Sequence, residues 1–167
     1  MVTRRDLAVR WAAYAAATLL LMLLDALALR RVQLLGVIPF LPPVLAATVG
    51  SLEDAREATV YALVLGICCD LTLTATLPCL YTLTLVPAAL FAALIARQLL
   101  QPGLPCALAV SALAFVLVDA VGALPLLLRG AQAGALFSLA LRETAVSLLL
   151  LPLCYPVLSW VHRRVTL

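Results

Sequence analysis

Long apolar runs separated by short polar connections dominate the chain, and they predict helices that cross a membrane. The first run, residues 7–29, holds 23 residues, and a helical span needs about 20. A six-span arrangement fills residues 1–167 as a single transmembrane domain. We place the spans at about 7–29, 34–50, 58–77, 79–96, 105–128 and 134–160. The pattern therefore predicts an all-α bundle of about six transmembrane helices.

The second predicted span is short and contains Pro39, Pro42 and Pro43. Proline removes a backbone donor and clashes with the preceding turn, so we expect these residues to kink the helix. Backbone carbonyls that lose their partners in lipid must find others, so neighbouring helices should shield this segment. The sequence leaves two alternatives open, a kinked full span or a re-entrant segment.

Residues 71–77, LTLTATL, alternate apolar and threonine positions with the period of a β-strand. A single strand cannot lie in lipid with its backbone unpaired. We interpret the stretch as a helix end followed by a short extended turn that Pro78 terminates.

Composition strengthens the membrane interpretation and excludes several classes of protein. Apolar residues make up 66% of the chain and charged residues 11%, with a mean hydropathy of +1.18, whereas soluble domains have about 25% charged residues. The net charge of +3 is too small for nucleic-acid binding. The five cysteines form no CxxC pair, so we expect no metal and no cofactor. The stretch at 3–9 resembles a twin-arginine signal, but an uncleaved first helix fits the 23-residue run better.

The distribution of arginines predicts the orientation. With six spans and a cytoplasmic N-terminus, seven arginines of the connections and ends lie inside and three lie outside, which favours N-in and C-in. The inside set is Arg4, Arg5, Arg10, Arg56, Arg97, Arg163 and Arg164. Arg30 and Arg31 lie outside and violate the rule locally, so the main rival topology omits the second span.

Ionisable residues inside the predicted spans are the candidate functional residues. Besides Asp25, which lies near a span end, they are Asp70, Asp119, Arg142 and Glu143. Each would cost about 2.5–3.5 kcal/mol at a lipid-facing central position. Counted along their helices, these four lie at a similar depth in the outer half, which predicts a buried polar layer.

We expect Arg142 to pair with Asp70 and to serve Asp119 as well. Gly66, four residues before Asp70, and Gly122, three after Asp119, should let helices approach closely. The layer could be an ion pair that fixes packing, a pocket for a ligand or proton, or a set of charges that reach the interface. No nucleophile elbow, HExxH or phosphate loop is present, so we expect no enzyme.

Three stretches resemble the bacterial rod shape-determining protein family MreD. They are GICCD at 66–70 with the turn and apolar span that follow, VIPFLPPVLA at 37–46, and LRETAVSLLLLPLCYPVLSWVHRRV at 141–165. The similarity in length and span count covers the whole chain.

The resemblance implies a fold similar to the S components of energy-coupling-factor transporters. It also implies a non-enzymatic scaffold of the cell-wall elongation machinery in the bacterial cytoplasmic membrane. Its implied partners are an MreC-like membrane protein and, indirectly, MreB, RodA and a penicillin-binding transpeptidase. The alternative function is an S-component-like substrate-binding subunit of a vitamin transporter, with the outer polar layer as its pocket.

Overall fold

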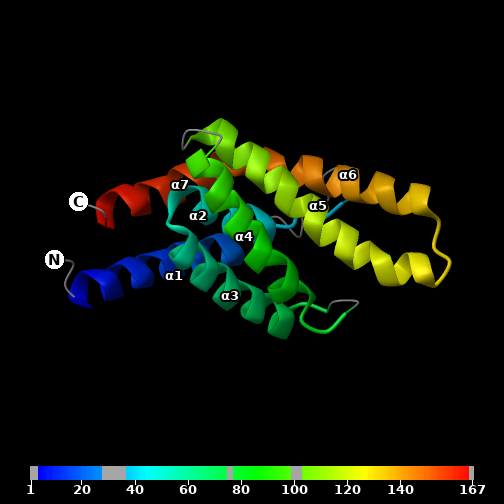
Figure 1. Cartoon of the computed structure of the whole chain (residues 1–167), viewed down its shortest axis with the longest axis horizontal. Helices are drawn as coiled ribbons and strands as arrows, with labels where there is room; N and C mark the ends of the chain where they lie inside the picture. Colours follow the sequence, from blue (N-terminus) through cyan, green and yellow to red (C-terminus); the bar gives the residue numbers. More distant parts are fainter. Residues whose placement is uncertain (1–3, 28–36, 75–76, 99–102, 166–167) are drawn as a thin grey trace.

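The computed structural model describes residues 4–27, 37–74, 77–98 and 103–165, and these form seven helices in an all-α bundle (Figure 1). Their bounds are α1 (Arg4–Leu27), α2 (Pro42–Leu52), α3 (Ala55–Thr72), α4 (Leu80–Gln98), α5 (Leu104–Leu128), α6 (Ala133–Leu149) and α7 (Leu151–Val165). Within this described part, α1, α4 and α5 are long and apolar enough to cross a membrane, and α6 with α7 gives a fourth candidate. The chain is therefore a multi-pass membrane protein.

Some predicted features fall outside the described residues. Residues 28–36 are among these, so the end of the first predicted span, the start of the second, and Arg30 and Arg31 are not placed. The same holds for residues 75–76, in the predicted turn after Asp70.

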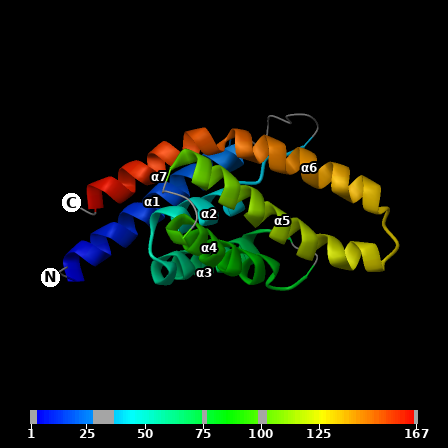
Figure 2. The ribbon, with the colours of Figure 1, turned by 45° about the horizontal axis from the view of Figure 1, so that its top comes forward.

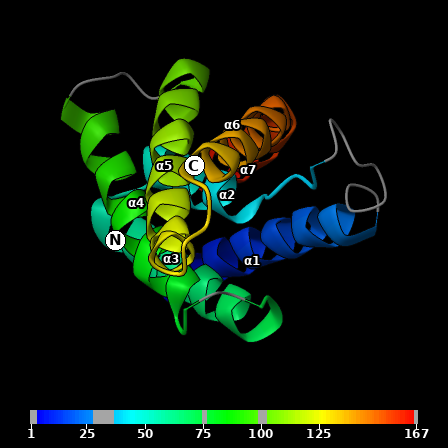
Figure 3. The same ribbon diagram turned by 90° about the vertical axis from the view of Figure 1, so that its right-hand side faces the viewer.

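The short helix α2 lies at the centre of the bundle, and all of residues 42–51 are buried. It packs against α3, α4, α5 and α7, and Figure 3, which looks along the bundle, shows it among the longer helices. Its 11 residues span only about 16 Å, too short for a hydrocarbon core of about 30 Å. The expectation that neighbouring helices shield this segment is confirmed.

The three prolines of this segment do not kink a helix, and that prediction is wrong. Pro42 and Pro43 occupy the first turn of α2, and Pro39 precedes the helix. Proline suits the first turn because the N–H groups there have no intrahelical partner. These residues therefore set where α2 begins.

Glycine and alanine bring α2 and α4 unusually close together. A Cβ atom at Gly50 of α2 would lie 2.7 Å from the Ala89 carbonyl oxygen and 2.9 Å from the Ala92 Cβ. The buried face of α4 contributes Ala88, Ala89, Ala92, Ala93 and Ala96. Small residues on both helices allow this crossing, since no side chain separates the two backbones.

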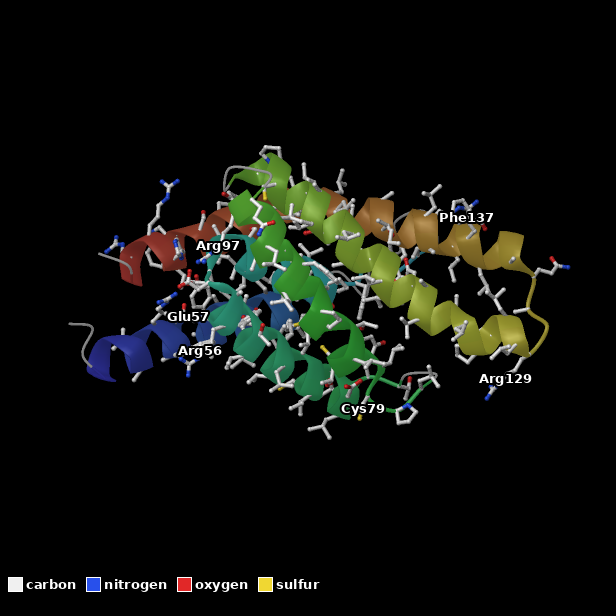
Figure 4. All side chains as sticks on the ribbon, viewed as in Figure 1. Arg56, Glu57, Cys79, Arg97, Arg129 and Phe137 are labelled. Carbon is white, nitrogen blue, oxygen red and sulfur yellow. The ribbon has the colours of Figure 1, made fainter. Side chains whose placement is uncertain are left out.

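The chain runs back and forth, so that α1 begins and α7 ends at the same end of the bundle (Figures 1 and 2). We call this the terminal end, and it also holds Arg56, Glu57 and Arg97; the opposite end holds Cys79 and Arg129 (Figure 4). Helix α1 packs on α7. The buried residues of α1 recur at helical spacing: Tyr14, Ala17, Leu21 and Asp25.

The last predicted span, 134–160, is broken into α6 and α7, which meet at an angle of 49°. Pro152 explains the break, because it has no N–H to donate to the carbonyl of Leu148 and its ring clashes with that turn. Leu150 links the two helices, and its carbonyl accepts the first hydrogen bonds of α7 from Leu153 and Cys154.

Candidate functional site

Asp70, on the last turns of α3, binds the first turn of α4. Its carboxylate accepts hydrogen bonds from the backbone N–H groups of Tyr81 and Thr82, both at 2.9 Å, and from the Thr82 hydroxyl at 2.6 Å. The first N–H groups of a helix have no intrahelical partner, and the helix dipole favours an anion there. Asp70 thus caps α4 from a neighbouring helix.

Two residues around Asp70 make this contact possible. Cys79 has a positive φ of 57°, a left-handed conformation that turns the chain into α4. Gly66 faces the same turn of α4, and a Cβ atom there would lie 2.7 Å from the Thr82 Cα. The predicted close approach at Gly66 is confirmed, and the GxxxD pattern is a joint between α3 and α4.

The predicted ion pair between Asp70 and Arg142 is wrong. Arg142 is exposed on α6 and forms no ion pair with any residue in the described ranges. The acceptor oxygens of Asp70 are taken by Tyr81 and Thr82. Depth along a helix cannot tell which side of α6 an arginine occupies.

Asp119 and Glu143 line one cavity near the opposite end of the bundle. The cavity has a volume of about 240 Å³, and Phe40, Thr74 and Tyr81 are also in its wall. The Thr144 hydroxyl donates a long hydrogen bond of 3.5 Å to Asp119. Two of the four predicted polar residues therefore line this cavity, Asp70 is linked to it only through its hydrogen bond with the Tyr81 N–H, and Arg142 is not part of it.

Gly122 lines the same cavity but has a different role from Gly66. A Cβ atom at Gly122 would approach only the Leu80 Cδ2, at 3.8 Å, which is ordinary contact. The expected close helix approach at Gly122 is therefore wrong, and the glycine instead leaves room in the cavity wall.

A second polar cluster at the terminal end was not predicted. Glu53, between α2 and α3, is only 7% exposed and accepts hydrogen bonds from Arg10 and from the Tyr14 hydroxyl. Its Oε1 also lies 2.8 Å from the Nδ1 of His162, and Arg10 bridges to Glu57. One carboxylate therefore ties together α1, the α2–α3 connection and α7.

Only a weak signal in the sequence points to this cluster. Glu53 lies in SLEDARE at 51–57, the most polar connection, where an exposed side chain is the ordinary expectation. Its burial depends on α1 and α7, which are far away in the sequence. A neighbouring pair, Asp54 and Arg97, stays exposed and joins the same connection to the end of α4.

An apolar groove of about 470 Å³ separates α5 from α6. Small side chains line much of it, with Asp119 and Thr144 among the lining residues. None of residues 121–145 is buried, and Figure 2 shows this helical pair projecting past the other helices. The second half of α5 and most of α6 are therefore loosely packed, whereas the first half of α5 is buried against the other helices.

The arrangement supports structural and binding roles for its polar groups. Two carboxylates beside a tyrosine and a threonine could accept hydrogen bonds from a ligand or hold a proton. Within the described part, no group of three or more His, Cys, Asp or Glu side chains could hold a metal ion. Comparisons with protein-family models, with curated proteins and with solved structures gave no match to this chain.

Proposed function

We propose that this chain is a non-enzymatic scaffold of the bacterial cell-wall elongation machinery, similar in role to the MreD family that its sequence resembles. In this proposal it crosses the cytoplasmic membrane six times, with both ends inside. It binds an MreC-like membrane protein and, through it, MreB, RodA and a penicillin-binding transpeptidase.

The observation that carries this proposal is the use of charged side chains as ties between helices. Asp70 fastens α3 to α4, and Glu53 fastens α1 and α7 to the α2–α3 connection. The GxxxD pattern on which the resemblance rests is one of these ties. Because these carboxylates form their hydrogen bonds with other helices of the same chain, they favour a rigid bundle that other proteins recognise.

The cavity at Asp119 and Glu143 favours a second candidate, an S-component-like subunit that binds a small substrate. Its volume of about 240 Å³ is below the range of about 300–1,000 Å³ that is usual for ligand pockets. A vitamin would fill it only after the neighbouring helices moved apart. The scaffold is therefore the better-supported function.

Depletion of the protein in its own bacterium tests the two candidates together. The scaffold predicts that cells lose their rod shape and that the tagged protein co-purifies with the MreC-like protein. In depleted cells Asp70→Ala, which weakens the bundle, should fail to restore rod shape and should lose the co-purification. Glu143→Gln, which alters only the cavity, should restore rod shape and keep the co-purification. Normal cell shape together with a small molecule retained by the purified protein, and lost in Glu143→Gln, would favour the transporter subunit.

A further inference from the structure

The outward face of α6 carries a single charge in an otherwise small and apolar stripe. We call it the Arg142 face, and it consists of Ala135, Ser138, Arg142, Ala145 and Leu149, all of them exposed. Residues at this spacing share one side of a helix. Ala140 and Thr144 line the groove between α5 and α6. At about 100° per residue, they lie on the other side of α6 from the Arg142 face.

Arg142 lies deep along the helix. It is nine residues beyond Ala133, where α6 begins, which corresponds to about 14 Å. Half of a hydrocarbon core is about 15 Å. A guanidinium at this depth needs an anion or water, and arginines within spans almost always face protein. None of the described residues supplies that anion.

We propose that the Arg142 face binds a transmembrane helix of a different membrane protein, and that an aspartate or glutamate on that helix pairs with Arg142. Ala135, Ser138 and Ala145 would let the two backbones come close, as small residues do in membrane helix pairs. The carboxylate supplies the missing charge. The expectation of a protein partner rests on the proposed scaffold function. The pairing of Arg142 with a carboxylate applies whichever membrane protein supplies the helix.

A second copy of this chain fits the face poorly. Two-fold pairing through the same face brings one Arg142 toward the other. The carboxylates at similar depth are turned elsewhere, since Asp70 caps α4 and Asp119 and Glu143 line the cavity. Lipid also fits poorly, because acyl chains carry no anion and phosphates lie at the membrane surface.

Photo-crosslinking in the native membrane tests the proposal. We would place p-benzoylphenylalanine at Ser138, one turn from Arg142, and at Phe91 as a matched control, an exposed aromatic on α4. The expected result is one protein adduct at Ser138, whose partner has an apolar helix with an acidic residue, and no such adduct at Phe91. Arg142→Gln should reduce the adduct at least about tenfold, and Arg142→Lys should retain it.

A charge exchange decides the case even if Arg142→Gln lowers the amount of folded protein. Arg142→Glu should abolish the adduct, and an arginine in place of the partner's acidic residue should restore it. Lipid adducts alone, an adduct between two copies of the chain, or an adduct indifferent to Arg142→Gln would overturn the proposal. An adduct with a partner unrelated to cell-wall synthesis would support the docking face and contradict the proposed function. Loss of rod shape on depletion without a protein adduct at Ser138 would support the proposed function and contradict the docking face.

Discussion

At the scale of single residues, Asp70 shows how a charge is kept in an apolar chain. Its carboxylate accepts three hydrogen bonds from the start of α4, and hydrogen bonds to a charged group contribute about 1.5–3 kcal/mol each. We expect Asp70→Ala to lower the free energy of unfolding by about 2–4 kcal/mol, because two backbone donors lose their acceptor. Thermal unfolding of the detergent-solubilised protein measures the loss.

Two further variants identify the partners of Asp70. Asp70→Asn keeps one acceptor oxygen without the charge, so its free energy of unfolding should lie between those of the wild type and Asp70→Ala. Arg142→Ala should leave the stability of the isolated protein nearly unchanged, and its effect should add to that of Asp70→Ala. If the double variant loses less stability than the sum of the two single losses, Asp70 and Arg142 interact, and the predicted ion pair would be supported against the structure.

At the scale of helices, close crossings depend on glycines whose neighbours are backbone atoms. At Gly66 a methyl group would meet the Thr82 backbone, whereas at Gly122 the nearest atom is the end of a leucine side chain. Overpacking of this kind costs about 1–3 kcal/mol, so Gly66→Ala should lower the unfolding temperature and Gly122→Ala should not. Helix propensity alone favours alanine over glycine, so equal losses in the two variants would contradict the assignment of the effect to the close crossing at Gly66.

At the scale of the whole molecule, the sequence predicted the class of protein and most of the helices. The class follows from composition, and the helices follow from the lengths of the apolar runs along the chain. The sequence also predicted the contact at Gly66, because residues four apart share a helix face. It failed for Arg142, where depth is readable from the sequence but direction around the helix is not. It missed Glu53 because α1 and α7, which bury that residue, are distant in the chain.

The path of the chain through the bundle gives the last prediction. The start of α1, the α2–α3 connection, the start of α5 and the end of α7 share the terminal end, and Arg129 lies at the opposite end (Figures 1 and 4). Gly103 directly precedes α5. Described arginines are also concentrated at the terminal end, including Arg56 and Arg97. Since basic residues favour the cytoplasm, this end should face inward.

Reporter fusions check this orientation. Fusions at Gly103 and after α7 should report the cytoplasm, and a fusion at Ala131, between α5 and α6, should report the outside. The buried α2 is too short to cross alone, which makes this test discriminating, since α3 starts inside only if the chain crosses the membrane between α1 and α3. A cytoplasmic signal at Ala131 with an external one at Gly103 would mean that this return does not cross the membrane and would favour the five-span topology.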